Sequence, residues 1–235
     1  MNIDSIKIIH YTPLVERREF LTNWFETHNI TNFSFKADCD REILTTERIQ
    51  QWATEKAQKR LDRGTMAVNI AWWETLAEIK DENLVLIVED DAIFCDNFVE
   101  MLDRALKNLP QDFEIGWLSD GFGFHIDEKF LEDGTWWYKS PNANRTTCAV
   151  LIRGSASKKI LENYPKFDAI VDAHLTDICE NLNLGSYWIE PTLVTQGTQR
   201  GVYDSCLRNF TFQFGHEMYE KIYTKEKTRF QPRSI

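Results

Sequence analysis

Short apolar runs alternate with segments of helical periodicity along most of the chain. The runs that predict strands are residues 6–11, 33–37, 84–88, 115–118, 136–138, 148–152 and 187–189. Apolar residues recur every three or four positions, and so predict helices, at 14–26, 49–61, 66–76, 98–109, 155–163 and 171–182. We expect Asp96 to cap the helix that starts at Phe98, and Pro110 to end it.

The run at residues 84–88 is apolar on both of its faces. A continuous run of this kind indicates a central strand that helices cover on both sides. The regular alternation of strands and helices predicts an α/β fold, with one domain built on a mostly parallel central sheet flanked by helices. Such sheets bind their ligands beyond the carboxyl ends of the strands.

Composition narrows the class of protein. The chain has 235 residues, 43% of them hydrophobic and 13% aromatic, which is enough to fill one core and excludes a disordered chain. No apolar run approaches the roughly 20 residues of a membrane span, and no signal peptide is recognised, so we expect a cytoplasmic protein. Five cysteines without a CxxC pair fit a reducing compartment. The net charge of −10 argues against a general nucleic-acid binder.

The most informative residues follow the central run directly: Glu89, Asp90 and Asp91. Three neighbouring carboxylates repel one another, and a cation would offset that repulsion. Oxygen ligands suit Mg²⁺ or Mn²⁺. Glu89 and Asp91, two residues apart, are expected to act together, one on the metal and one on a ribose hydroxyl or the metal's waters. The alternative is an acidic loop that caps a helix and faces water.

The stretch LVLIVEDDAIF is similar to the (L/I)xLEDDA signature of glycosyltransferase family 25, the lipopolysaccharide and collagen sugar-transferase group. Further segments resemble the family in the right order, over most of residues 5–207: residues 8–20 with Glu16, Arg17 and Arg18, then Ala37 with Asp38, TCAVLIRGSASKKIL at 147–161, residues 170–175, and EPTLVTQ at 190–196. The family's Ser-His pair is replaced here by Ala71 and Trp72. The chain therefore resembles a divergent member.

The resemblance implies a GT-A fold and transfer of a sugar, with inversion, from a nucleotide diphosphate donor. Inversion needs one general base, for which a carboxylate is sufficient. Asp172 matches the Asp of a family segment and begins a predicted helix, so it is the leading base; its alternative role is a helix N-cap. Asp120 is the second candidate for the base; its alternative role is that of a turn residue.

Several residues are expected to bind the donor because they follow predicted strands or lie beside them. Tyr11, Thr12 and Pro13 would meet the base, Arg17 the diphosphate, Asp38 a ribose hydroxyl or the uracil N–H, and Gln196 the donor sugar. Glu89 and Asp90 are expected to contribute to donor binding as well. For each, an ordinary structural role at a strand end, a loop or a helix surface is the alternative.

The resemblance to GT-A enzymes implies that a donor from the C-terminal part completes the metal site. We expect the metal ligands to be Asp91, Glu89 and His216, with His174 as the other candidate, although either histidine has an ordinary structural alternative. The division expected is a glycosyltransferase domain at 1–215 and a basic extension at 216–235, which either contacts an anionic acceptor or is a solvated tail.

The prediction is thus a glycosyltransferase that moves a hexose or deoxyhexose from a nucleotide sugar and uses Mn²⁺ or Mg²⁺, with UDP as the expected nucleotide. The acceptor is a hydroxyl on a glycan, a lipid-linked sugar or a protein, with a modified nucleic acid less favoured. Two alternatives stay open: an idle nucleotide- or carbohydrate-binding module of the same fold, and a metal-dependent phosphohydrolase.

Overall fold

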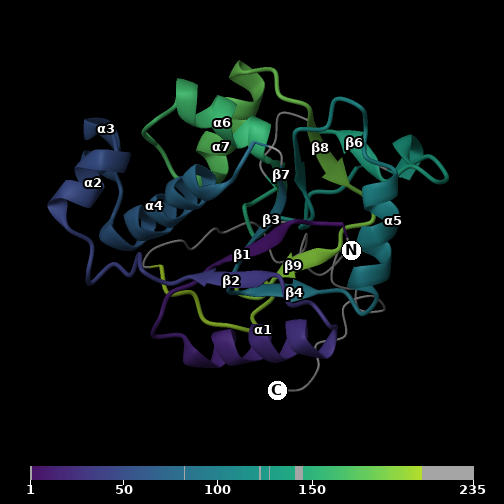
Figure 1. Ribbon diagram of the computed structural model, residues 1–235, viewed down its shortest axis with the longest axis horizontal. Coiled ribbons are helices and arrows are strands. Elements are labelled where there is room, and N and C mark those ends of the chain that lie inside the picture. Colours follow the sequence, from purple (N-terminus) through teal and green to yellow (C-terminus); the bar gives the residue numbers. More distant parts are fainter. Residues whose placement is uncertain (1, 82, 122, 127, 141–144, 208–235) are drawn as a thin grey trace.

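A seven-stranded sheet with the strand order β2-β1-β3-β7-β5-β8-β6 forms the centre of the computed structural model (Figure 1). The structure describes residues 2–207 except 82, 122, 127 and 141–144. Its strands are β1 (Ser5–Ile9), β2 (Phe33–Lys36), β3 (Leu84–Glu89), β5 (Ile115–Trp117), β6 (Trp137–Lys139), β7 (Ala149–Arg153) and β8 (Ser186–Ile189). β1 pairs in parallel with β2 and β3, and β5 with β8, whereas β7 and β6 run antiparallel to their neighbours. The prediction of a mostly parallel sheet is confirmed.

Helices cover both faces of this sheet (Figure 1). α4 (Arg63–Glu78), α6 (Gly154–Asn163) and α7 (Val171–Asn181) pack with Val85 and Ile87 of β3 in one core. α1 (Val15–Thr27) and α5 (Phe98–Lys107) pack with Leu86 and Val88 in the other. β3 therefore contributes alternate side chains to two cores, which explains its unbroken apolar sequence.

Two expectations about the elements were wrong, and one feature was not expected. The single helix predicted at 49–61 is two helices, α2 (Thr46–Trp52) and α3 (Glu55–Arg60), because Ala53 bridges to Phe167 and the side chain of Thr54 caps α3. Asp96 does not cap α5: the N-cap residue is Asn97, and it makes no side-chain capping bond. A second sheet of β4 (Ala92–Phe94) and β9 (Val194–Gln196) was not predicted.

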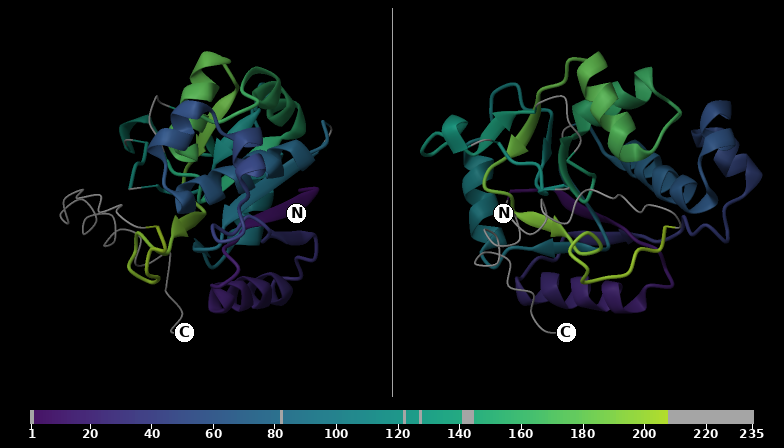
Figure 2. Two further views of the ribbon diagram at one scale, coloured as in Figure 1. Left: turned by 90° about the vertical axis from the view of Figure 1, so that its left-hand side faces the viewer. Right: turned by 180° about the vertical axis from the view of Figure 1, so that it is seen from behind.

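The remaining described parts of the chain are a short helix and the segment that follows β9. A short 3-10 helix, η1 (Glu128–Phe130), lies between β5 and β6. Residues 197–207 follow β9 and pass beside α1 (Figure 2, yellow-green), where Arg17 donates to the carbonyl of Asp204 at 2.7 Å. Within the described residues, no helix combines the length and apolar character needed to cross a membrane.

Shortening a side chain of the central strand β3 should destabilise the fold, because the side chain of Ile87 is fully buried. We expect Ile87→Ala to lower the free energy of unfolding by about 2–5 kcal/mol, the usual loss for such a cavity. Urea unfolding followed by tryptophan fluorescence measures this loss. Ile43→Ala is the control, since Ile43 is 59% exposed, and its effect should be within about 0.5 kcal/mol. Equal effects of the two variants would contradict the central position of β3.

Candidate active site

The carboxyl end of β3 places three consecutive carboxylates in three different environments. Glu89 is the last residue of the strand, and Asp90 and Asp91 form the turn that leads into β4. Asp90 and Asp91 are buried and Glu89 is partly buried. Each acid has its own set of partners.

Asp90 joins the first strand and the first helix to the end of β3. Its carboxylate lies 2.9 Å from Nδ1 of His10 and accepts hydrogen bonds from the backbone N–H of Tyr11 at 3.0 Å and from Nη1 of Arg17 at 2.8 Å. The ion pair with Arg17 is buried, and the Arg17 guanidinium also stacks over the ring of Tyr203. Arg17, predicted at the diphosphate, therefore lies beside the acidic turn with its charge balanced by Asp90.

Asp91 holds the segment that follows β9. Its Oδ2 accepts a hydrogen bond of 2.5 Å from the hydroxyl of Thr198, and its backbone carbonyl accepts one of 2.7 Å from the N–H of Gly197. Glycine is required at 197, because an added Cβ would lie 2.5 Å from the ring of Tyr203. The other carboxylate oxygen, Oδ1, is buried and accepts no hydrogen bond from the described residues. Asp91 thus offers one oxygen to a ligand.

Glu89 and Asp172 meet at one hydroxyl. Oγ1 of Thr147 lies 2.8 Å from Oε1 of Glu89 and 2.5 Å from Oδ1 of Asp172, and the backbone N–H of Thr147 donates to the same Asp172 oxygen at 2.8 Å. Removal from water, and then repulsion by Asp172, raises the pKa of Glu89. Removal from water also raises the pKa of Asp172, against the hydrogen bonds from Thr147.

The hydrogen count at this hydroxyl agrees with those directions. Thr147 carries one hydroxyl proton and can donate it to only one of the two carboxylates. The second contact is a hydrogen bond only when the other carboxyl group is protonated. Without a cation, the pair Glu89 and Asp172 therefore retains one proton at pH values above the usual pKa range of carboxyl groups.

These residues fit a divalent cation. Removal from water raises the pKa of Asp91 too, so negative charge is disfavoured at all three of Glu89, Asp91 and Asp172. A bound cation would reverse this preference, and the free Oδ1 of Asp91 is a suitable ligand. The predicted ligand His216 lies outside the described residues. His174 is buried and stacks on Trp73, with Nδ1 3.3 Å from Asp168, so its ring belongs to the core that α7 forms with α4.

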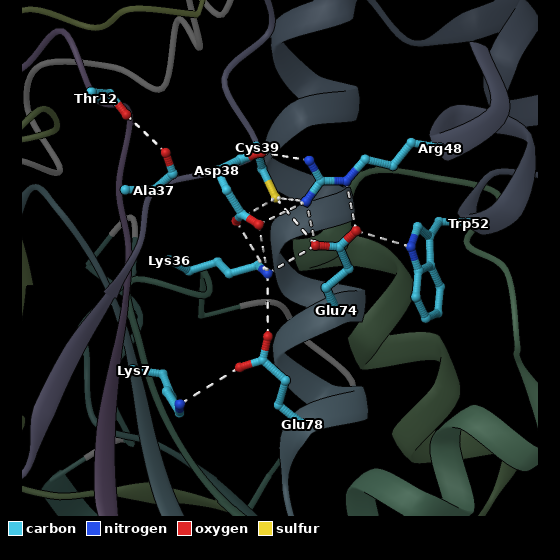
Figure 3. A network of polar contacts seen from close by, with 10 residues as sticks. All are labelled: Lys7, Thr12, Lys36, Ala37, Asp38, Cys39, Arg48, Trp52, Glu74 and Glu78. Carbon is cyan, nitrogen blue, oxygen red and sulfur yellow. Dashed lines mark hydrogen bonds and ion pairs between the residues drawn. The ribbon is translucent and has the colours of Figure 1, made fainter. Parts of the chain in front are cut away.

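Asp38, predicted at the ribose, follows β2 and belongs to a charged network (Figure 3). Asp38, Cys39 and Glu74 are, within the part of the chain that the structure describes, a group whose potential ligand atoms lie within 4.8 Å of one another. Lys36 and Arg48 already balance the two carboxylates, at 2.9 Å and 2.5 Å from Glu74. Although burial opposes it, hydrogen bonds from Arg48 and Lys36 lower the pKa of Glu74 to about 2. This network is neutralised by protein side chains.

The residues predicted at the nucleotide base lie at the carboxyl end of β1. The hydroxyl of Tyr11 donates to Glu42 at 2.7 Å, and the hydroxyl of Thr12 donates to the carbonyl of Ala37 at 2.9 Å. Thr12 and Pro13 are exposed and Tyr11 is partly exposed. The structure therefore brings this corner next to the loop that holds Asp38, with surface left open to solvent.

Asp120 is buried beneath β9. It accepts a hydrogen bond of 3.1 Å from the hydroxyl of Thr195 and pairs with Arg200. Gln196, predicted at the donor sugar, lies opposite Ala92 in the small sheet. Ala92 directly follows Asp91 in the chain, so Gln196 lies near the acidic turn. Its Oε1 is buried and accepts no hydrogen bond from the described residues.

Asp172 does not cap its own helix. The N-cap residue of α7 is Ile170, and the side chain of Asn69 in α4 accepts the hydrogen bond from the N–H of Val171 at 3.1 Å. This leaves the Asp172 carboxylate available to Thr147.

Sequence reasoning missed the residues that hold the acids: His10, Thr147, Thr198 and Arg200. Thr147 opens the family-like segment at 147–161 and lies next to a predicted strand, but neither fact indicated that it contacts Glu89 and Asp172. Nothing in the local sequence marks the other three.

The chain is similar to a known family and to solved structures of other proteins. A family model described as glycosyltransferase family 25 (LPS biosynthesis protein) matches residues 5–175. No match is found among curated proteins. The galactosyltransferase LgtC, solved in complex with donor and acceptor sugar analogs, is 13% identical, with a TM-score of 0.45 over 94% of this chain and 95% of that chain. Mouse xyloside xylosyltransferase 1, in its apo form, is 12% identical, with a TM-score of 0.34 over 80% of this chain and 69% of that chain.

Neutralising Asp90 should weaken the whole edge, because Asp90→Asn leaves the buried Arg17 charge uncompensated. We expect a loss of about 3–5 kcal/mol in the free energy of unfolding, as for other broken buried ion pairs. Chemical denaturation measures it, with the exposed Asp96→Asn as the control. A loss no larger than that of the control would show that the ion pair does not stabilise the fold.

Glu89→Gln should stabilise the metal-free protein near neutral pH. Because the folded-state pKa of Glu89 is raised, stability falls as the pH rises from the ordinary glutamate range through that raised value. We therefore expect the variant to melt a few degrees higher at about pH 7.5, with the gain absent at about pH 4.

Glu74→Gln is the matched control for that experiment, with the opposite sign. Its folded-state pKa of about 2 gives stability that is present above the ordinary glutamate range and is lost as the pH falls toward 2. This variant should melt below the wild type at about pH 7.5. Thermal melts with EDTA present measure both variants, and a lower melting temperature for Glu89→Gln would refute the unfavourable burial of that charge.

Proposed function

Because the chain belongs to glycosyltransferase family 25, we propose that it transfers a sugar from a nucleotide diphosphate, UDP, to a hydroxyl acceptor with Mn²⁺ or Mg²⁺ bound at the end of β3. The observation that carries the proposal is the gathering of Glu89, Asp91 and Asp172 at one edge, each with a raised pKa. Acids kept so close together and so poorly neutralised are typical of functional sites.

Glu89 and Asp91 would hold the metal ion, with His216 as the third protein ligand. A divalent ion there supplies the positive charge that stabilises a departing diphosphate. Asp90 and Arg17 support this site through their ion pair, which fixes the turn between Glu89 and Asp91. The donor nucleotide would extend from the ion toward Tyr11, Thr12, Pro13 and Asp38, and the sugar toward Gln196.

Asp172 is the proposed general base. Its carboxylate contacts the same Thr147 hydroxyl as Glu89, and this closeness to a proposed metal ligand supports the assignment. It would take the proton of the acceptor hydroxyl as that oxygen attacks the sugar, which gives inversion in a single displacement. Asp120 is less suitable, because its pairing with Arg200 and Thr195 occupies its carboxylate.

Metal dependence is tested by titrating Mn²⁺ and UDP calorimetrically and by following UDP release from a panel that includes UDP-galactose and UDP-glucose. Asp91→Asn should remove both Mn²⁺ binding and turnover. Asp172→Asn should lower kcat by about 10²–10⁴-fold, the usual contribution of a general base, with the affinity for UDP nearly unchanged.

The exposed Asp96→Asn is the control and should behave as the wild type. Metal-dependent turnover that survives Asp91→Asn would move the metal site elsewhere. Tight binding of Mn²⁺ and UDP with no turnover on any donor or acceptor would favour the idle module, and release of phosphate from simple phosphate esters would favour a phosphohydrolase.

A further inference from the structure

We propose that Thr147 is a positioning residue, which fixes the carboxylate of Asp172 in the place where it acts as the base; this inference rests on the proposed function. Three observations carry it: the contacts of Thr147, the backbone at Thr146, and the way the preceding residue is anchored.

The first observation is that Thr147 holds Asp172 with two groups at once. Its backbone nitrogen and its hydroxyl oxygen both contact Oδ1 of Asp172, at 2.8 Å and 2.5 Å, and Thr147 itself is fully buried. Two donors on one oxygen define both the position and the direction of the carboxylate, and leave its Oδ2 for another contact. Neither donor comes from α7, so Asp172 is oriented by a different element from the one that carries it.

The second observation is an unusual backbone conformation directly before Thr147. Thr146 is buried and has φ of 62°, in the left-handed region that β-branched residues rarely adopt. The strain turns the chain just ahead of β7. The last ladder bond on this side runs from the N–H of Glu89 to the carbonyl of Cys148, and the next N–H, that of Thr147, is directed at Asp172. Strain kept in a buried site is a pointer to function.

The third observation is that Arg145 anchors the chain two residues earlier. Its fully buried side chain pairs with Glu190, donates to the carbonyl of Ile189 at 2.8 Å, and stacks over Trp188. Its backbone carbonyl accepts a hydrogen bond of 3.0 Å from the hydroxyl of Ser119. The chain two residues before Thr147 is therefore held against the end of β8.

The backbone of Arg145 also packs closely against a neighbouring loop. The backbone of Arg145 lies against Gly121, where an added Cβ would come within 1.9 Å of the Arg145 carbonyl. The rigid support and the two donors together explain how a base on a helix end is kept in one orientation.

The kinetic test uses Thr147→Val, which keeps the N–H and the shape of the side chain and removes the hydroxyl. We expect kcat for UDP release from UDP-galactose or UDP-glucose with Mn²⁺ to fall by up to about 10²-fold, the cost of a misplaced catalytic group, with the KM for the donor unchanged. Thr147→Ser keeps the hydroxyl and should recover most of the activity.

Thr75→Val is the matched control, because Thr75 is a fully buried threonine of α4 whose hydroxyl makes no hydrogen bond among the described residues. It should leave kcat unchanged. Should Thr147→Val fail to fold, Thr147→Ala replaces it under the same expectations.

A double-mutant cycle separates positioning from a merely structural role. In the Asp172→Asn background, Thr147→Val should cost less than about 3-fold in kcat, since the group it positions is already lost. An equal cost in both backgrounds would overturn the inference. A crystal structure of metal-free Thr147→Val gives a readout without activity: the Asp172 side chain should leave its wild-type rotamer, and an unchanged rotamer would overturn the inference.

The outcomes also separate this inference from the proposed function. If Asp172→Asn loses turnover while Thr147→Val does not, the function stands and the role of Thr147 is wrong. If the wild type turns over no donor of the panel, or if Asp172→Asn is fully active, the proposed base is wrong and the inference is overturned with it.

Discussion

Repulsion among three successive carboxylates is the constraint around which this sheet edge is organised. The turn after β3 separates the charges by sending each side chain to a different neighbour: Asp90 to Arg17 of α1, Asp91 to Thr198 beyond β9, and Glu89 to Thr147 before β7. The contacts that keep the charges apart are thus the same contacts that join the first helix, the small sheet and the reversed strand to the centre. A change at this turn would therefore disturb the packing of the first helix, the small sheet and the reversed strand.

Among the described residues, Asp90 is the only one of these three acids that forms an ion pair with an arginine or a lysine. Asp90 has a buried arginine, whereas Glu89 and Asp91 have hydroxyl groups as their nearest donors, and a second acid, Asp172, shares the Thr147 hydroxyl. The network around Glu74 shows the contrast, because Lys36 and Arg48 meet its carboxylate directly and lower its pKa to about 2. The described part of the chain therefore neutralises Glu74 with its own lysine and arginine side chains, but leaves Glu89, Asp91 and Asp172 without such a partner. Poorly neutralised buried acids of this kind are typical of functional sites, where a cation could bind.

The sequence predicted what depends on local pattern and missed what depends on distant partners. The position of β3 followed from residues 84–88, since an unbroken apolar run needs cover on both faces. The break between α2 and α3 did not follow, because the partner of Ala53 is Phe167. The three-residue strands β4 and β9 form only by pairing with each other. The three acids lie at the end of β3, where the sequence predicted them, but the ion pair of Arg17 with Asp90 was not predicted, because the two residues are 73 positions apart in the chain.

The antiparallel strand β7 brings Thr147 to the acidic edge. β7 begins at this edge, since Ala149 at its start lies opposite Val88 near the end of β3. The residues just before β7 therefore lie beside the acids that follow β3, and Thr147 contacts both Glu89 and Asp172. The backbone N–H of Thr147 donates to Asp172, as the N–H of Tyr11, after β1, donates to Asp90. Because an ionised carboxylate can only accept hydrogen bonds, the acids at this edge are held by donors from the neighbouring strand ends.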